Sequence, residues 1–239
     1  MRHAGPVINQ PEHAPASVEC VVLDPFLESG ATGFDGIRLA QVPFVPGVRL
    51  YLAEDAIVLR ARLEAQVGGA LQQPFWADAW VGGQVLARYI VDHPDVVAGR
   101  RVLDVASGSG LIAIAAAMAG AAAVTANEID PYALAAIALN ARANGVAVEV
   151  RRGDLLDGDG DDAEVVLAGD VFYSESMSER MLGFLERAAA RGARVLVGDP
   201  GRPHLPHGRL KVVSSYQVSR VGAIEDAEIT RADVLTPVL

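Results

Sequence analysis

The chain has 239 residues, of which 51% are hydrophobic, a formal net charge of −10 and a mean hydropathy of +0.26. This length is sufficient for one large domain with an extension, and the apolar content is enough to bury a core, which argues against a disordered chain. The negative charge excludes the broad basic face that phosphate-driven binding of nucleic acid requires. It suits a small-molecule ligand or a positively charged protein partner.

Membrane segments and cysteine-based sites are not expected from the sequence. No stretch reaches 18 uninterrupted apolar residues, and residues 1–20 lack the apolar run of a signal peptide. The one cysteine, Cys20, excludes an internal disulfide framework and a multi-cysteine zinc site. We therefore expect a cytoplasmic protein with no bound metal and with neither a membrane nor a nucleic acid as partner.

The N-terminal part of the chain has an irregular pattern. Residues 1–35 are rich in Pro, Gly, Ala and His and are expected to be only partly ordered, with a candidate strand at 18–23. Hydrophobic spacing then predicts two short strands and two helices, at 37–42, 48–52, 53–67 and 82–93. We expect residues 1–70 to form an N-terminal extension and 71–239 to form the ligand-binding domain.

From Arg101 onward the pattern becomes regular, with strands and helices in alternation. The predicted strands lie at 101–105, 122–127, 146–151, 164–169 and 193–198, and the predicted helices end at 120 or span 132–144 and 176–190. Such alternation is typical of a parallel sheet covered on both faces. Residues 210–220 and 225–236 alternate like two strands without a helix between them. The predicted fold is a doubly wound α/β protein with a mostly parallel seven-strand sheet and an antiparallel C-terminal hairpin.

A glycine-rich turn follows the first strand of the regular part. Asp104 is followed by Val-Ala-Ser-Gly-Ser-Gly, which ends at Gly110. In doubly wound sheets ligands bind beyond the carboxyl ends of the strands, where helix N-termini offer backbone N–H groups. Gly108 and Gly110 let the backbone approach a ligand closely because they have no Cβ. A plain strand-to-helix turn is the alternative interpretation.

Two cofactor classes are compatible with this turn. Gly108-Ser109-Gly110-Leu111-Ile112-Ala113 satisfies the dinucleotide pattern G-x-G-x-x-A, and Glu128 ends the next strand where that pattern has its ribose-binding acid. Acids also end the first and third strands, at Asp104 and Asp154. A carboxylate in the turn repels a pyrophosphate but favours a cationic sulfonium. The three acids therefore favour S-adenosylmethionine as the cofactor, with an NAD-dependent oxidoreductase and a non-catalytic cofactor-binding protein as alternatives.

Several longer motifs resemble one family. They are Pro-Phe-Trp-Ala-Asp-Ala-Trp-Val-Gly-Gly-Gln at 74–84, the turn at 102–110, Asn-Glu-Ile-Asp-Pro at 127–131, Gly-Asp-Val-Phe-Tyr at 169–173 and Val-Gly-Asp-Pro-Gly-Arg-Pro at 197–203. In this order, over roughly residues 36–206, they resemble the electron-transfer-flavoprotein β-subunit lysine methyltransferases. These are seven-strand S-adenosylmethionine-dependent enzymes with a Rossmann-like fold and a D-x-x-Y signature.

The resemblance implies roles for particular residues. The implied cofactor-binding residues are Trp76, Trp80, Gly82, Gly83, Asp104, Ala106, Ser107, Gly108, Gly110, Glu128, Ile129, Asp154, Leu155 and Asp170. Asp170 and Tyr173 are the implied catalytic residues at the substrate end. The chain departs from the pattern at Ala106, which replaces a glycine, at Val81, which replaces a proline, and at Glu128, which replaces an aspartate.

The acceptor implied by the resemblance is a lysine side chain on a protein, with the β-subunit of an electron transfer flavoprotein as the first candidate. Asp170 then orients the incoming ammonium group, and Tyr173 narrows the channel. Residues 169–173 lack the proline pair of the enzymes that methylate planar amides. A small amine such as nicotinamide is the alternative acceptor.

Structural interpretations of the same residues also exist. Trp76 and Trp80 suit a core packing pair, and Asp170 suits a cap for the helix that follows it. Residues 199–203 suit either a rigid turn or a lip of the substrate channel, on which Arg202 fixes a carboxylate of the partner.

Overall fold

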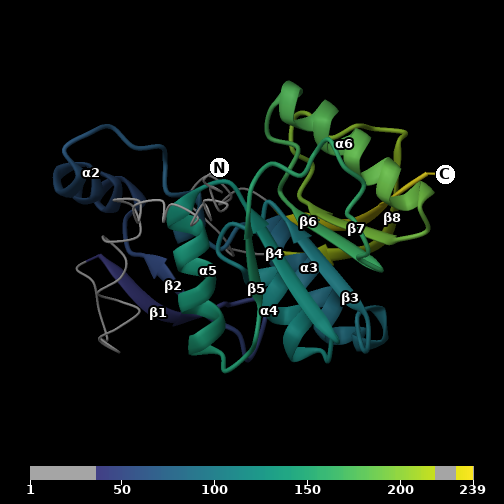
Figure 1. The fold of residues 1–239 in the computed structure, drawn as a ribbon, viewed down its shortest axis with the longest axis horizontal. Coiled ribbons are helices and arrows are strands. Elements are labelled where there is room, and N and C mark those ends of the chain that lie inside the picture. The colour runs from purple at the N-terminus through teal and green to yellow at the C-terminus, as the bar shows by residue number, and fades with distance from the viewer. Residues whose placement is uncertain (1–35, 219–229, 239) are drawn as a thin grey trace, which may run out of the picture.

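The computed structural model describes residues 36–218 and 230–238 and has a seven-stranded mixed sheet at its centre (Figure 1). The strands are β3 (Arg101–Val105), β4 (Ala123–Glu128), β5 (Glu149–Arg152), β6 (Val165–Gly169), β7 (Arg194–Asp199), β8 (Leu210–Gln217) and β9 (Arg231–Pro237). Their order is β5-β4-β3-β6-β7-β9-β8. The first five in this order run parallel, β9 is antiparallel to β7, and β8 is antiparallel to β9. The predicted mostly parallel sheet with an antiparallel C-terminal hairpin is confirmed.

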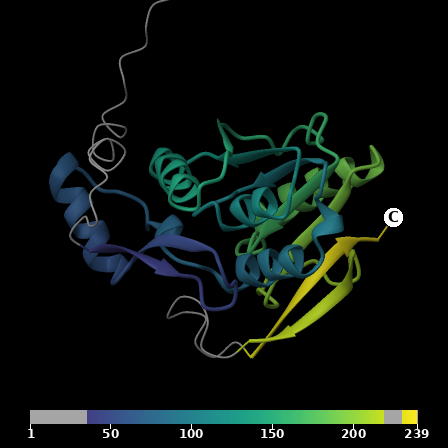
Figure 2. The ribbon, with the colours of Figure 1, turned by 90° about the horizontal axis from the view of Figure 1, so that it is seen from below.

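Helices cover both faces of this sheet, as Figures 1 and 2 show from two directions. They are α3 (Val81–Asp92), α4 (Leu111–Met118), α5 (Pro131–Ala143) and α6 (Glu175–Ala190). Val102 packs with residues of α3, α4 and α5, whereas its neighbour Leu103 packs with residues of α6. Successive side chains of β3 thus point to opposite faces that are both covered by helices, which explains why Val102 and Leu103 are adjacent and both buried. Within the described ranges, no helix is long and apolar enough to cross a membrane.

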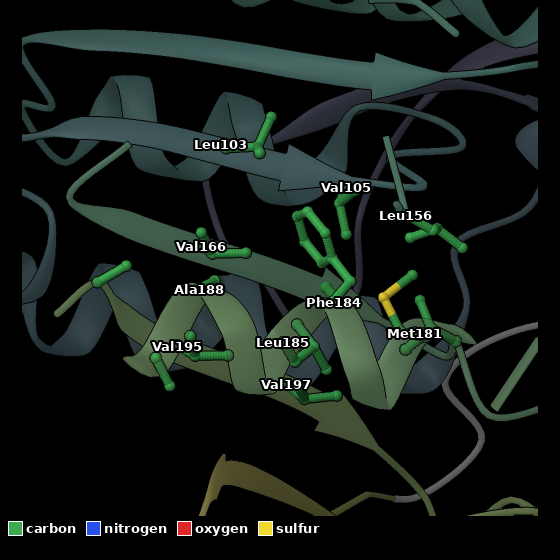
Figure 3. Packing of buried hydrophobic residues seen from close by; sticks show 14 of the residues in the cluster. Leu103, Val105, Leu156, Val166, Met181, Phe184, Leu185, Ala188, Val195 and Val197 are labelled. Carbon is green, nitrogen blue, oxygen red and sulfur yellow. The ribbon is translucent and has the colours of Figure 1, made fainter. Parts of the chain in front are cut away.

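The α6 face has a closely packed core (Figure 3). Met181, Phe184 and Leu185 of α6 are fully buried. They pack against side chains of three neighbouring parallel strands, namely Leu103, Val105, Val166, Val195 and Val197. This packing fixes the strands β3, β6 and β7, whose carboxyl ends lead into the turns that the sequence singles out, because interiors of this density do not deform without a cost in free energy.

An N-terminal hairpin and helix pack beside the sheet. β1 (Ile37–Gln41) and β2 (Arg49–Ala53) pair in antiparallel fashion, and α2 (Ala56–Val67) packs with α5 through Leu59 and Leu63. Asn140 of α5 joins the hairpin to the glycine turn, since its Oδ1 accepts the Tyr51 N–H at 2.8 Å and its Nδ2 donates to the Ser109 carbonyl at 2.8 Å. The division of the chain at residue 70 stays a prediction, and the candidate strand 18–23 lies outside the described residues.

Element boundaries differ from the prediction where side chains or pairing partners decide them. Helix α2 begins at Ala56 because Asp55 accepts the N–H groups of Ile57 and Val58 at 2.9 and 3.0 Å, which makes Asp55 the cap. Strand β5 begins at Glu149, three residues later than predicted, where its pairing with β4 begins. Two short 3₁₀ helices, η1 (Phe75–Ala77) and η2 (Pro94–Val96), were not predicted.

Two glycines allow α3 to lie directly on the sheet. A Cβ on Gly198 of β7 would collide with the carbonyl of Gly82 and would approach the Leu86 Cβ to 2.8 Å. A Cβ on Gly82 would likewise collide with the Gly198 carbonyl and approach Asp170 Oδ2 to 2.6 Å. The absence of a side chain at both positions therefore brings the first turn of α3 against the ends of β6 and β7.

We expect Gly198→Ala to destabilise the protein by about 3 kcal/mol, since the obstructing atoms are backbone and cannot rotate away. Gly69→Ala is a matched control, because a Cβ at Gly69 meets nothing within 4 Å, and it should change the free energy of unfolding by less than about 1 kcal/mol. Urea unfolding of both variants measures the difference. Equal midpoints for the two variants would contradict the close helix–strand contact.

Candidate active site

A cavity of about 390 Å³ lies at the carboxyl ends of β3, β4 and β6, within the size range of small-molecule sites. Ten of the residues that the sequence singles out line it, namely Trp76, Trp80, Ala106, Gly108, Glu128, Ile129, Asp154, Leu155, Asp170 and Tyr173. Five others do not line it, namely Gly82, Gly83, Asp104, Ser107 and Gly110. The cavity thus gathers turns that follow separate strands, as expected for the switch region of a parallel sheet.

The glycine turn and Glu128 form one hydrogen-bonded unit. Glu128 ends β4, and its carboxylate accepts the Gly108 N–H at 3.0 Å and the Ile129 N–H at 2.7 Å. Gly108 and Gly110 have φ values of 56° and 82°, which favour glycine. Ala106, where the wider pattern has glycine, has a φ of 54° and so carries some backbone strain.

Asp104 does not line the cavity but stabilises the glycine turn through hydrogen bonds on the side away from it. Its carboxylate is fully buried and accepts the Ser107 hydroxyl and, at 3.1 Å, the Ala113 N–H in the first turn of α4. Burial raises the pKa of Asp104 to about 7, although these two hydrogen bonds act in the opposite direction. The geometry therefore makes Asp104 a brace between β3 and α4.

Gly82 and Gly83 lie in the first turn of α3 and do not line the cavity. The resemblance implies that both bind the cofactor, whereas in the structure the lack of a side chain at Gly82 serves the contact between α3 and the sheet. The Gly83 N–H donates to Asp170 Oδ2 at 2.7 Å. Because Gly83 lies in the first turn of α3, Asp170 satisfies one of the unpaired N–H groups of that helix.

Asp170 does not cap α6, the helix that follows it. Ser174 is the N-cap of α6, and its side chain accepts the Met177 N–H at 3.4 Å. Asp170 has a φ of 56°, and its Oδ1 accepts two bonds from Arg202, from Nη2 at 2.7 Å and from Nε at 3.2 Å. Burial raises the pKa of Asp170 to about 6 in spite of the Arg202 charge.

The turn that follows β7 is both rigid and part of the cavity wall. Asp199 is almost fully buried, and its Oδ1 accepts the N–H groups of Gly201 and Arg202, both at 2.7 Å. This turn places the Arg202 guanidinium 5.4 Å from the centre of the Trp80 ring. The sequence interpretation, with this turn as a lip of the substrate channel, predicted that Arg202 binds a carboxylate of a partner protein. In the structure Arg202 pairs with Asp170 of the same chain.

The two tryptophans have different environments. Trp76 is 4% exposed and packs with residues of α2 and α5 while it also lines the cavity. Trp80 is the N-cap residue of α3, and its Nε1 donates to the Phe75 carbonyl at 2.8 Å. The core-packing interpretation therefore describes Trp76, whereas Trp80 supports Arg202.

Asp154 has a cationic partner that the sequence did not suggest. Arg180 of α6 lines the cavity and contacts Asp154 Oδ2 through Nη1 at 2.8 Å, and it lowers the pKa of Asp154. The partners are 26 residues apart, and no local motif marks them. Asn127 is a second missed residue, whose Nδ2 donates to the carbonyls of Arg151 and Gly153 and so holds the end of β5 against β4.

Comparison with known proteins connects this site to methyltransferases. Residues 86–169 match the family described as Ribosomal protein L11 methyltransferase (PrmA). Over 169 residues the chain is 36% identical to the electron transfer flavoprotein beta subunit lysine methyltransferase of Xenopus laevis, which covers 67% of this chain and 68% of that protein. It is 44% identical over 132 residues to the protein of the same name from Rattus norvegicus, covering 54% of this chain and 52% of that protein. The chain thus spans about half the length of the rat relative.

A solved structure supports the fold. A putative RNA methyltransferase from Pyrococcus horikoshii superimposes with a TM-score of 0.50 at 17% identity, over 66% of this chain and 83% of that chain. At this identity the likeness concerns the fold alone and says nothing about the acceptor. By its sequence identity to the Xenopus laevis protein over two thirds of both chains, the protein belongs to the electron transfer flavoprotein beta subunit lysine methyltransferase family.

Proposed function

We propose that the protein is an S-adenosylmethionine-dependent methyltransferase that modifies a lysine side chain on a protein. The observation that carries this proposal is the carboxylate of Glu128 bonded across the glycine turn, at 3.0 Å from the Gly108 nitrogen, with Asp170 on another wall of the same cavity. The arrangement provides an acid for a ribose and an acid for a cationic acceptor. Family membership and the strand-end location of the cavity agree with it.

The cavity residues fit this cofactor. The Glu128 oxygens can accept bonds from ribose hydroxyls and keep their backbone partners, since a carboxylate oxygen has two lone pairs. Ile129 and Leu155 provide apolar contacts for an adenine ring, and Asp154 provides an acceptor for the adenine amine. Asp104, Ser107 and the remaining glycines hold these groups in place without lining the cavity.

A dinucleotide fits the turn less well. Phosphates bind glycine turns through unpaired backbone N–H groups. Here the Gly108 N–H donates to Glu128, and the Gly110 N–H donates to the Ser107 carbonyl at 2.9 Å. We therefore favour the sulfonium cofactor over NAD.

The acceptor amine must be neutral in order to react. A lysine with a pKa near 10.4 costs about 4–5 kcal/mol to deprotonate at pH 7. When bound, S-adenosylmethionine supplies the methyl group: the lone pair of the acceptor nitrogen forms the nitrogen–carbon bond, the carbon–sulfur bond breaks with its electrons left on sulfur, and the proton of the amine passes to water. Asp170 orients the arriving ammonium group, and Tyr173, 60% exposed beside the cavity, restricts its approach.

The acceptor that we favour is the β-subunit of an electron transfer flavoprotein. The names of the curated relatives support it, as do the absence of a proline pair at 169–173 and the net charge of −10. A small amine such as nicotinamide is the second candidate for the same cavity. A cofactor-binding protein without turnover is the third.

Glu128→Ala should weaken S-adenosylmethionine binding by about 1–3 kcal/mol, because charge-assisted hydrogen bonds to the ribose are lost. Titration calorimetry measures the effect. Glu149→Ala is the matched control, since Glu149 lies on the adjacent strand β5 and does not line the cavity. Unchanged affinity in a folded Glu128→Ala variant would remove Glu128 from the cofactor site.

Asp170→Asn should lower methyl transfer by about 100-fold or more yet leave the affinity for S-adenosylmethionine within a few-fold, because Asp170 belongs to the acceptor end of the cavity. The substitution keeps an oxygen that can accept the Gly83 N–H. Asp92→Asn on the exposed end of α3 is the control, and it should retain normal turnover. Near-normal turnover by Asp170→Asn would show that Asp170 serves only the first turn of α3.

Methylation of a basic protein surface should slow as salt rises. The acidic enzyme attracts such a partner through exposed charges, and added salt screens this attraction. Methylation of free nicotinamide should show little salt dependence because nicotinamide is neutral. Incubation of the purified flavoprotein β-subunit and of nicotinamide at low and high salt, with mass spectrometry of the products, tests both. Label on nicotinamide alone would exclude the lysine acceptor and keep the methyltransferase assignment.

A further inference from the structure

The acceptor end of the cavity contains an ion pair that is largely shielded from solvent and is supported by an aromatic ring. The side chains of Asp170 and Arg202 are 10% and 16% exposed, and Arg202 makes two hydrogen bonds to one oxygen of the carboxylate. Trp80 supports the guanidinium from the side, at 5.4 Å from the ring centre. Three separate segments thus hold one cation against the carboxylate that we assign to the acceptor amine.

The charges around Asp170 come from few groups. Asp199 at the end of β7 and Arg202 in the turn that follows face it, and the Gly83 N–H faces it from the positive end of α3. Tyr173 follows it on the chain and is uncharged at neutral pH. Among the described residues, Arg202 is therefore the cation that offsets the Asp170 carboxylate where an acceptor nitrogen arrives.

An ion pair and a lone carboxylate would treat an arriving amine differently. A lone buried carboxylate stabilises the ammonium form, which has no lone pair and cannot react. A second cation beside the site opposes protonation of the amine, which is one way in which enzymes activate lysine nitrogen. The observed pairing therefore orients the nitrogen through Asp170 without fixing a proton on it.

We propose that Arg202 is a positioning residue that offsets the charge of Asp170 at the acceptor end of the cavity and so favours the unprotonated, nucleophilic form of the acceptor amine. This inference rests on the proposed methyltransferase function and adds to it a residue for which the sequence suggested another partner. It also predicts a dependence on pH that a purely structural arginine does not produce.

The test is the single-turnover rate of methylation of the purified flavoprotein β-subunit, with saturating cofactor and protein, from about pH 6.5 to about pH 10. Arg202→Gln should react about tenfold more slowly near pH 7, with the midpoint of its pH–rate profile about one unit higher, because one pKa unit is a factor of ten in the neutral amine. The difference should shrink above about pH 9.5. Arg202→Lys retains the charge, so its midpoint should stay within about 0.3 unit of wild type.

Arg209→Gln is the matched control, because Arg209 pairs with Glu186 of α6 and does not line the cavity. Its profile should coincide with that of wild type. An equal loss at every pH in Arg202→Gln would overturn the inference and indicate a structural role. The concentration of the β-subunit is varied in a parallel series, and a rise in its KM with an unchanged midpoint would overturn the inference in favour of a contact with a carboxylate of the partner.

If Arg202→Gln does not fold, the midpoint of the pH–rate profile of Arg202→Lys is sufficient to test the inference. A wild-type midpoint in folded Arg202→Lys supports the inference, and a midpoint raised by about one unit contradicts it. Thermal unfolding reports the fold of each variant. Wild-type enzyme that transfers no label to the β-subunit at any pH, while it binds the cofactor, would overturn the proposed acceptor itself, which is a different outcome from altered variants of an active enzyme.

Discussion

The site depends on the contact between the first turn of α3 and the ends of β6 and β7. Gly82 and Gly198 meet there without side chains, and this closeness allows the Gly83 N–H to reach Asp170 at 2.7 Å. The same helix start places Trp80 beside Arg202. This one backbone contact therefore positions Asp170, Arg202 and Trp80. A larger distance between Gly82 and Gly198 would separate the three side chains.

Much of the fold could be predicted, because each strand and helix has its own hydrophobic period and its own terminating turn. The glycines show the limit of this reasoning. A glycine pair indicates close approach of something to the backbone, and at Gly82 and Gly83 that neighbour is the sheet and Asp170, where a ligand was expected. Arg180 escaped prediction because its partner Asp154 lies 26 residues away on a different element. Acids at strand ends can be recognised in a sequence, whereas the pairing of these acids with distant arginines cannot.

The net charge of the chain and the charge of the cavity are separate quantities. The whole sequence has a formal charge of −10, yet Asp154 pairs with Arg180, Asp170 pairs with Arg202, and Glu128 accepts three backbone N–H groups. A negative long-range field favours a basic partner over an acidic one, since surface charge acts over about 10 Å at moderate salt. Inside the cavity, each of these carboxylates has a local partner that the net charge of the chain does not reveal.

The same pairing logic separates the two ends of the cavity. At the cofactor end, Glu128 is held by backbone N–H groups, which have no charge to titrate and which a phosphate would otherwise use. At the acceptor end, Asp170 is held by a guanidinium, which stays cationic over the whole working range of pH. A carboxylate held by backbone amides keeps its charge for a ligand, whereas a carboxylate held by arginine has that charge offset. The first arrangement suits neutral hydroxyl donors, and the second suits an amine that must give up its proton.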